Sequence, residues 1–222
     1  LASYLQSTYQ LSTVNTFFTG MSNGGELSYL LACEVPNFFR AFAPVAGTIF
    51  PNGLTNNICS PTSPVSIFET HGRNDNVTLI DGDPFNQYWG PYLGIDTIIN
   101  FWVNHNSLTD LVVDTFPNLN NNNKITISYK YSSPIANNEV WLYTHKSGHN
   151  WGDDGDVVIE EEIWDFFSKM SLSQSTFVEE NHKSSRLIKV VDILGRISIE
   201  KQNSLVFYIY DDGTVEKRII IE

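Results

Sequence analysis

The sequence predicts an α/β fold in which a mostly parallel sheet is covered by helices on both faces, followed by a small antiparallel β-module. Two patterns predict the larger part: β-prone apolar runs alternate with stretches of helical spacing, and a glycine-rich turn joins one such run to a helix. The smaller part follows from a change in composition, because only short β-runs occur after a polar, Ser-rich stretch. We therefore expect a main domain over 1–170, a linker over 171–186 and a β-module over 187–222.

Length and charge limit the kinds of protein this can be. The chain has 222 residues, 41% of them hydrophobic, and a formal net charge of −12 at pH 7. A chain this acidic repels phosphate backbones, so we expect no nucleic-acid partner. No apolar run approaches the roughly 20 residues that span a bilayer, so we expect no transmembrane segment. The chain begins at Leu1 inside a helical pattern without an initiator Met, and we expect that the N-terminal part of the natural protein, with any signal peptide, is absent.

Residues 20–25, Gly-Met-Ser-Asn-Gly-Gly, form the turn between a β-prone run and a helix-like run. The order strand, glycine turn, helix is the context of a nucleophile elbow, in which a strained turn projects a serine hydroxyl beyond the sheet edge. Ser22 is therefore the candidate nucleophile, and the backbone N–H of Asn23 is the candidate first donor of an oxyanion hole. Gly20 and Gly24 are expected to give the turn clearance, and Gly25 to let the helix pack closely on its strand. The alternative is an ordinary small-residue turn.

The rest of the main domain alternates strands and helices. The helix after residues 20–25 is expected to have an apolar face at Leu27, Leu30 and Leu31 and to end near Glu34, before Val35-Pro36. The expected strands cover 41–45, 64–72, 125–131 and 139–144, of which the last two could pair with each other. The expected helices cover 1–9, 95–106 and 156–170, the last with an apolar face of Val157, Ile163, Trp164 and Phe167. A loop is expected over 51–63, and the short β-runs of the tail cover 187–193, 197–200, 205–210 and 215–221.

A serine hydroxyl needs a base to take its proton, and the base is best supplied by one of the five histidines. His149 is favoured, because it lies in the middle of the loop after the last strand of the expected sheet; His145, closer to that strand, is the alternative. His71 falls inside the strongest strand, where a structural hydrogen bond suits it better. His105 and His182 are expected at the surface.

The base in turn needs a carboxylate to orient it. Asp75 follows the strand end at Gly72 by three residues and is favoured over Asp81 and Asp83, which lie in a more open segment. The order Ser22, Asp75, His149 is the chain order of α/β-hydrolases.

Other residues carry weaker expectations. Tyr88, Trp89 and Trp151 flank the acid and base loops and are hypothesised to line a substrate cleft, although ordinary core packing explains them equally well. The even cysteine count slightly favours a disulfide between Cys33 and Cys59 over two unpaired buried thiols. The Asp-rich stretch 153–156 lacks the ligand spacing of a calcium loop and is better explained by helix capping, so we expect no metal and no cofactor.

Several motifs together resemble the polyhydroxybutyrate depolymerase and feruloyl esterase group of secreted α/β-hydrolases, over residues 1 to about 170. The motifs are Gly20-Met21-Ser22-Asn23-Gly24-Gly25, Leu31-Ala32-Cys33-Glu34-Val35-Pro36, Ala43-Pro44-Val45-Ala46-Gly47, His71-Gly72-x-x-Asp75, Gly148-His149-x-Trp151 and Ile163-Trp164-Asp165-Phe166-Phe167. The resemblance implies an α/β-hydrolase fold and a serine esterase with Ser22 as nucleophile, Asp75 as acid and His149 as base. It also implies a second oxyanion donor from a loop before Leu1, and it raises the expectation of the disulfide. The group often has a longer glycine run before the histidine than Lys146-Ser147-Gly148.

The tail, from Ile188-Lys189-Val190-Val191 to Lys217-Arg218-Ile219-Ile220-Ile221, resembles the C-terminal sorting module of the Bacteroidota type IX secretion system. This resemblance implies that the secretion machinery is a partner and that the protein is secreted or held at the cell surface. A β-appendage that merely stabilises the main domain is the alternative.

Together these features predict a serine carboxylic ester hydrolase that acts on a polymeric or small ester, either a polyester or a feruloyl or acetyl ester of xylan. The alternatives are a related serine peptidase and a non-catalytic secreted protein that binds a glycan or a surface.

Overall fold

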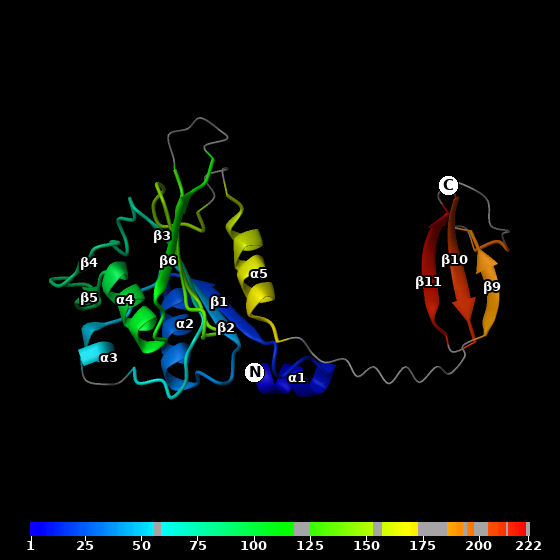
Figure 1. The fold of residues 1–222 in the computed structure, drawn as a ribbon, viewed down its shortest axis with the longest axis horizontal. Helices are drawn as coiled ribbons and strands as arrows, with labels where there is room; N and C mark the ends of the chain where they lie inside the picture. Colours follow the sequence, from blue (N-terminus) through cyan, green and yellow to red (C-terminus); the bar gives the residue numbers. More distant parts are fainter. Residues whose placement is uncertain are drawn as a thin grey trace. The chain divides into compact units, whose positions relative to one another are not determined.

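The computed structural model describes residues 1–55, 59–117, 125–152, 157–172, 186–192, 195–197, 204–211 and 213–220. The chain divides into two compact units, Leu1–Leu172 and Ser173–Glu222, which are drawn together in Figure 1. The predicted α/β class, with a small antiparallel sheet toward the C-terminus, is confirmed. The predicted linker over 171–186 lies mostly outside the described residues.

The first unit is built on a six-stranded sheet with the strand order β1-β2-β3-β8-β7-β6. The four strands from β1 to β8 in this order run parallel, and β7 and β6 continue the sheet antiparallel. As predicted, β7 and β8 pair with each other. The strands are β1 (Phe17–Met21), β2 (Ala41–Val45), β3 (Ile67–Gly72), β6 (Asp110–Thr115), β7 (Ile127–Ser132) and β8 (Val140–His145).

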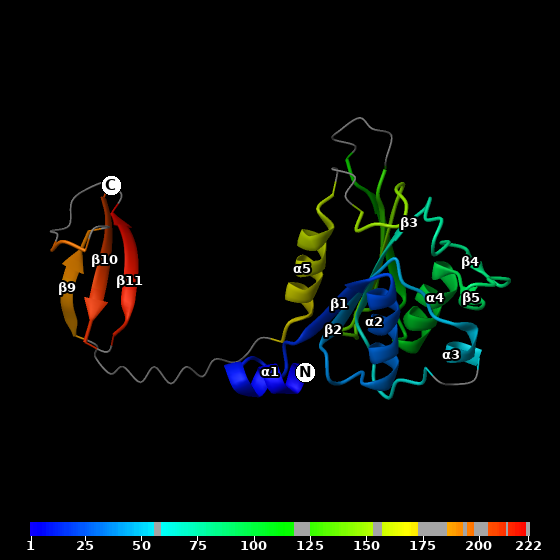
Figure 2. The same cartoon turned by 180° about the vertical axis from the view of Figure 1, so that it is seen from behind.

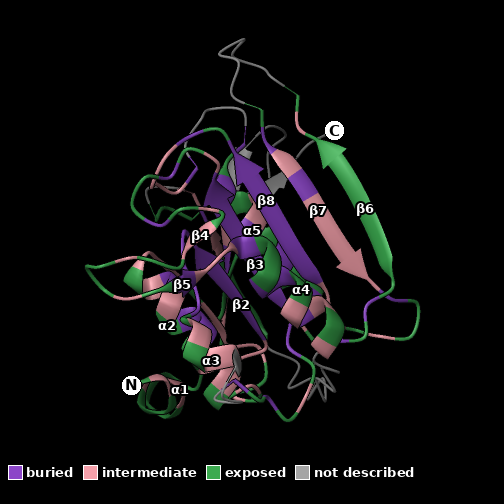
Figure 3. Ribbon diagram, turned by 90° about the vertical axis from the view of Figure 1, so that its left-hand side faces the viewer, coloured by how far each residue is buried: buried purple, intermediate pink, exposed green. Residues whose placement is uncertain are grey.

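Helices cover both faces of this sheet. Alternation along the strands sends Val140 and Leu142 of β8 into one apolar cluster and Trp141 and Tyr143 into another. Residues of α2 (Asn23–Glu34) and α4 (Ile95–His105) belong to the first cluster, and residues of α5 (Ile159–Met170) belong to the second. Figures 1 and 2 show α4 and α5 on opposite sides of the sheet. The unit is therefore a three-layer α/β structure, with β2, β3 and β8 the most deeply buried strands in Figure 3.

The predicted apolar face of α5 is wrong at one position. Trp164 is 65% exposed. The buried residues follow the spacing of a single helix stripe: Ile159, Ile163, Phe166, Phe167 and Met170. The helix also begins at residue 159 instead of 156, and residue 156 lies outside the described residues.

The predicted apolar face of α2 is wrong at two of its three positions, since only Leu31 packs against the first apolar cluster. Leu27 and Leu30 are 43% and 51% exposed, whereas Gly25, Ser28, Tyr29 and Ala32 are buried. The buried stripe consists mostly of small residues, which let the helix axis approach the sheet closely. Hydrophobicity alone could not identify this face.

Some short elements were not predicted. All six residues of β6 are exposed, so this edge strand lacks the alternation that marks a half-buried strand. The predicted loop over 51–63 contains the short helix α3 (Pro51–Thr55), and β4 (Gly82–Asp83) pairs with β5 (Tyr92–Leu93). The expected N-terminal helix is α1 (Ala2–Tyr9), which has no buried residue.

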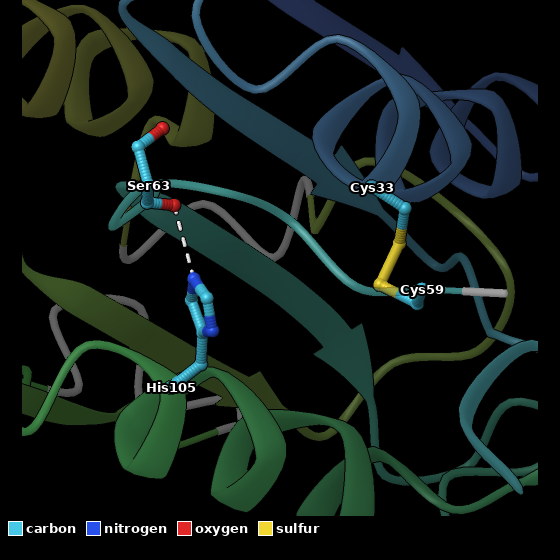
Figure 4. Close-up of a disulfide and its surroundings, with 4 residues drawn as sticks. All are labelled: Cys33, Cys59, Ser63 and His105. Atoms are coloured by element: carbon cyan, nitrogen blue, oxygen red, sulfur yellow. Dashed lines mark hydrogen bonds between the residues drawn. A yellow bond between two sulfur atoms is a disulfide. The ribbon is translucent and has the colours of Figure 1, made fainter. Parts of the chain in front are cut away.

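A disulfide ties the end of α2 to the segment that precedes β3. Cys33 and Cys59 are bonded, and Cys59 is buried in the first apolar cluster (Figure 4). The bond closes a sequence separation of 26 residues. It therefore restrains the chain between two elements that cover the same face of the sheet.

The second unit is a three-stranded antiparallel sheet with the order β11-β10-β9. Its strands are β9 (Leu187–Val191), β10 (Ser204–Tyr210) and β11 (Val215–Ile220). In the run predicted over 197–200, Ile197 forms only an isolated bridge with Val191, and the remaining residues lie outside the described part. None of the helices in the described ranges has the length and apolar character needed to cross a membrane.

Candidate active site at the carboxyl edge of the sheet

Ser22 alone forms the turn between β1 and α2. The strand ends at Met21, the helix begins at Asn23, and the backbone of Ser22 has φ 57° and ψ −116°. Such a conformation costs a non-glycine residue about 1–3 kcal/mol, so its surroundings must enforce it. The N–H of Ser22 donates to the Val45 carbonyl at 2.8 Å, and its carbonyl accepts the Glu26 N–H at 3.0 Å. The turn is thus fixed on both sides and holds the serine at the end of the strand.

Glycines allow the backbone segments around Ser22 to touch. A Cβ at Gly20 would lie 2.8 Å from the backbone of Gly24, and a Cβ at Gly25 would lie 2.8 Å from Gly47 Cα. Gly25 therefore lets α2 approach the end of β2 and Gly47, not its own strand β1 as predicted, while the close approach of α2 to β1 is at Gly24, opposite Gly20. A Cβ at Gly24 would meet nothing within 4 Å, so its predicted role in clearance is wrong.

Asn23 is the first residue of α2, so its N–H lies among those that have no partner within the helix. The positive end of the helix dipole adds to its ability to bind an anion. Asn23 also lines a cavity of about 350 Å³ between α2 and the segment around α3. An oxyanion formed beside Ser22 would meet a donor of the right kind here.

Asp75 and His149 form a hydrogen-bonded pair. His149 Nδ1 lies 2.7 Å from Asp75 Oδ2, and the side chains are 16% and 0% exposed, respectively. The other oxygen, Oδ1, accepts the N–H groups of Val77 and Thr78 at 2.8 and 2.9 Å. These bonds fix the rotation of the carboxylate. Because an ionised carboxylate only accepts, Nδ1 of His149 carries the proton, which leaves Nε2 of the neutral ring able to accept one.

The loops that carry Asp75 and His149 lie against each other. Asn74 N–H donates to the Ser147 carbonyl at 3.1 Å, and Asn74 Nδ2 donates to the Lys146 carbonyl at 2.8 Å. A Cβ at Gly72 would collide with the backbone of Ser147 and Gly148. This loop has a shorter glycine run before His149 than the family it resembles often has. It still contacts the loop that carries Asp75.

His145, the alternative base, belongs to the support of its own loop. It is fully buried, and its Nδ1 lies 2.8 Å from Ser147 Oγ. Ser147 Oγ in turn donates to Asn150 Oδ1, which also accepts the N–H of Gly152. His145 thus braces the loop that presents His149.

The topology brings the three predicted residues to one edge of the sheet. Ser22 follows β1, Asp75 follows β3 and His149 follows β8, and the carboxyl ends of these parallel strands are in register from Met21–Val45 through Val45–Thr70 to Gly72–His145. Asp75 and His149 are in contact. The hydroxyl of Ser22 makes no hydrogen bond with His149 among the described residues.

The remaining histidines are placed elsewhere. Both ring nitrogens of His71 are engaged, Nδ1 with Glu69 Oε1 at 2.9 Å and Nε2 with the Thr78 carbonyl at 2.8 Å. His105, predicted at the surface, is half-buried, and its Nε2 lies 3.0 Å from the Ser63 carbonyl (Figure 4). His182 lies outside the described residues.

The alternative acids are also placed away from a base. Asp81 is exposed, and Asp83 caps its own turn by accepting the Phe85 N–H at 2.9 Å. Within the described ranges, no group of three or more His, Cys, Asp or Glu side chains is arranged to hold a metal ion, and the Asp-rich stretch 153–156 lies outside those ranges.

The three predicted cleft aromatics do not gather. Tyr88 is 90% exposed, and Trp89 stacks on Tyr92 with ring centroids 6.3 Å apart. Trp151 packs against the apolar cluster on the α5 side. No ring contact joins Trp151 to the other two in the part of the chain that is described.

Sequence reasoning missed Tyr29 and Glu69. The Tyr29 hydroxyl donates to Glu69 Oε2 at 2.9 Å, and both residues are buried beside His71. The signal was present in β3, since Ile67-Phe68-Glu69-Thr70-His71 places two titratable residues inside an otherwise buried strand. Charged residues in such places are almost always paired.

Comparisons with known proteins point to esterases. No known protein-family model matches the chain. A probable feruloyl esterase C from Aspergillus terreus is 38% identical over 66 residues, which are 30% of this chain and 23% of that protein. A probable feruloyl esterase C from Aspergillus niger is 26% identical over 153 residues, 68% of this chain and 48% of that protein. The chain thus spans about a quarter to a half of the length of these relatives.

Among solved structures, an acetyl xylan esterase from Aspergillus awamori aligns with 75% of this chain and 64% of its own. The TM-score is 0.47 and the sequence identity 13%. Both sequence relatives are named as probable feruloyl esterases.

Proposed function

We propose that this chain carries the catalytic centre of a carboxylic ester hydrolase, with Ser22 as nucleophile, His149 as general base and Asp75 as the acid that orients the base. The observation that carries the proposal is the strained turn at Ser22, at the same sheet edge as the 2.7 Å pair of Asp75 and His149. The esterase names of the sequence relatives support it. The sequence motifs and the geometry therefore favour the same three residues.

The chemistry follows from the positions of these groups. Ser22 Oγ forms a bond to the ester carbonyl carbon while His149 Nε2 takes the hydroxyl proton. The carbonyl oxygen becomes an oxyanion that accepts a hydrogen bond from the Asn23 N–H. His149 then gives its proton to the leaving alcohol, and the acyl group stays on Ser22. Water, deprotonated by His149, releases the acid and restores the serine.

The substrate class proposed here is an ester on plant polysaccharide, either feruloyl or acetyl. The names of the sequence relatives favour it over polyhydroxybutyrate, since two of them are feruloyl esterases. A third is a bifunctional acetylxylan esterase/xylanase from Neocallimastix patriciarum. It is 33% identical over 73 residues, which are 33% of this chain and 10% of that protein. Assays of the full-length protein on feruloylated arabinoxylan, acetylated xylan and polyhydroxybutyrate separate the three. Cleavage of peptides with no action on esters would favour the peptidase alternative.

The test of the catalytic centre is the substitution Ser22→Ala in the full-length protein. Hydrolysis of p-nitrophenyl acetate should fall to the background rate, whereas Ser7→Ala should keep it, because Ser7 is exposed and its Oγ donates to the Tyr4 carbonyl in its own helix. Undiminished hydrolysis by a folded Ser22→Ala variant would remove Ser22 from the mechanism. Absence of hydrolysis in the wild type as well would favour the non-catalytic, glycan-binding alternative.

We also propose that the second unit directs export through the type IX system to the medium or the cell surface. Its support is the resemblance of the tail together with the compact antiparallel sheet of β9, β10 and β11. Fusion of residues 173–222 to a periplasmic reporter, in a bacterium that has this system, should bring the reporter to the cell surface. A reporter that stays in the periplasm would favour the stabilising-appendage alternative.

A further inference from the structure

A chain of buried polar side chains lies behind Asp75 on the side away from solvent. The Tyr29 hydroxyl donates to Glu69 Oε2 at 2.9 Å, and Glu69 Oε1 lies 2.9 Å from His71 Nδ1. His71 Nε2 lies 2.8 Å from the Thr78 carbonyl and 3.6 Å from Asp75 Oδ2. The side chains of Glu69, His71 and Asp75 are all 0% exposed. Burying so many titratable groups is costly, and packing alone does not require them.

The donors and acceptors around His71 define its protonation. A carbonyl oxygen can only accept, so Nε2 carries a proton that it donates to Thr78. Glu69 accepts from the Tyr29 hydroxyl and from the N–H of Gly47, and this set of donors suits an ionised carboxylate. Nδ1 of His71 must then also carry a proton. With Glu69 ionised, the ring is an imidazolium that bridges Glu69 and the Thr78 carbonyl.

The balance of forces on His71 agrees with this count. Burial lowers the pKa of His71, but the hydrogen bond and charge of Glu69, the Thr78 carbonyl and the charge of Asp75 together raise it above its ordinary value. Burial also raises the pKa of Glu69, against the bonds from His71, Tyr29 and Gly47. The charged form of the pair is favoured because the Tyr29 hydroxyl and the Gly47 N–H both donate to Glu69, and such donors stabilise a carboxylate more than a neutral carboxyl group.

We propose that His71, held charged by Glu69, is a positioning residue that fixes the orientation and ionisation of Asp75 and thereby sets the basicity of His149. This proposal rests on the proposed function, in which His149 is the base. His71 acts along two routes. It holds the Thr78 carbonyl while the N–H of the same residue holds Asp75 Oδ1, and its positive charge lies beside Asp75 Oδ2.

The groups that face this chain come from every element packed around it. Tyr29 comes from α2, Glu69 and His71 from β3, His149 from the loop after β8, and Tyr92, whose hydroxyl accepts the Leu79 N–H at 2.9 Å, from β5. The pKa of Tyr92 is raised, mainly by burial, so it stays neutral near pH 7. The imidazolium of His71 thus places a positive charge 3.6 Å from Asp75 Oδ2.

Three substitutions separate a positioning role from a structural one. Glu69→Gln keeps the shape but removes the charge that holds His71 protonated, and His71→Gln removes the ring. Both take the positive charge of His71 away from Asp75, so the acid limb of kcat/KM should move to higher pH. The movement should be smaller in Glu69→Gln, which also removes a negative charge. Tyr143→Phe is the matched control for the loss of a buried tyrosine–glutamate bond, because Tyr143 donates to Glu162 at 2.8 Å on the other face of the sheet.

The experiment combines ¹⁵N-histidine NMR with pH–rate profiles of the full-length protein. In the wild type, the ring nitrogens of His71 should show the imidazolium signature at pH 7, above the ordinary pKa of a histidine, and in Glu69→Gln they should show a neutral ring. The acid limb of kcat/KM for p-nitrophenyl acetate should move to higher pH in Glu69→Gln and His71→Gln and stay in place in Tyr143→Phe.

A neutral His71 in the wild type, or an unmoved acid limb in a folded Glu69→Gln variant, would overturn the proposal. If His71→Gln does not fold, the Glu69→Gln result decides alone. The NMR measurement needs no enzymatic activity. A charged His71 and a raised pKa of His149 in a protein without ester hydrolysis would support the positioning role and refute the proposed function.

Discussion

Asp75→Asn is the most informative single change at the candidate site, because the surroundings dictate how the new amide must point. The N–H groups of Val77 and Thr78 both donate to Oδ1, so the amide oxygen has to occupy that position. The amide nitrogen then faces His149 Nδ1 at the 2.7 Å contact and donates to it. This forces the neutral ring into the tautomer with the proton on Nε2, which cannot accept the proton of Ser22.

The size of the effect follows from two losses. A hydrogen bond to a charged group contributes about 1.5–3 kcal/mol, and here it would stabilise the imidazolium that forms as Ser22 attacks. The wrong tautomer adds to this, and the same substitution in Ser-His-Asp triads lowers kcat about 10⁴-fold. We therefore expect kcat to fall by about 10³- to 10⁴-fold, which equals about 4–5.5 kcal/mol of barrier. The bonds to Val77 and Thr78 persist, so the folded structure should be retained.

Initial rates with p-nitrophenyl acetate, measured beside circular dichroism, test this expectation. Asp81→Asn is the control, because Asp81 is an exposed carboxylate in the same region, and it should keep the wild-type rate within about twofold. A folded Asp75→Asn variant within tenfold of the wild-type kcat would refute the assignment of Asp75 as the orienting acid.

Three further predictions concern stability and can be measured by urea unfolding of the full-length protein. Gly25→Ala should lower the free energy of unfolding by about 1–3 kcal/mol, because its Cβ would lie 2.8 Å from the backbone after β2. Gly24→Ala should not lower it, since a Cβ there meets nothing within 4 Å. Equal losses would contradict the close approach. Reduction of the disulfide, which spans 26 residues, should lower the free energy of unfolding by about 3.5 kcal/mol, and an unchanged midpoint in reductant would argue against a bonded pair. Phe166→Ala should lower the free energy of unfolding by about 3–5 kcal/mol and Trp164→Ala by about 0.5 kcal/mol or less, because Phe166 is buried and Trp164 is 65% exposed. The reverse order would support the helix face predicted from the sequence.

The fold could be predicted from the sequence wherever burial left a pattern. β2, β3 and β8 are buried along their whole length, and their apolar runs marked them. β6 could not be found, because a fully exposed edge strand has no alternation. The buried face of α2 was missed for a different reason, since Gly25, Ser28 and Ala32 are small and Tyr29 is the one large residue among its four buried positions.

The sequence proposed the residues of the candidate site but not the contacts that support them. Chain order and strand ends pointed to Ser22, Asp75 and His149, because parallel strands place their carboxyl ends at one edge. The role of His145 within its own loop and the chain from Tyr29 to His71 depend on contacts between elements far apart in the sequence. A single sequence indicates that a glutamate in a buried strand needs a partner, but not which one.

Covalent labelling of Ser22 is the most direct test of the central claim, that a reactive hydroxyl stands at the carboxyl edge of this sheet beside the Asp75–His149 pair. The native full-length protein should react with a fluorophosphonate probe in a 1:1 ratio, and peptide mass spectrometry should place the adduct on Ser22. The heat-denatured protein and a His149→Ala variant should not react. Stoichiometric labelling at another residue, or no labelling of a protein that hydrolyses esters, would contradict the account.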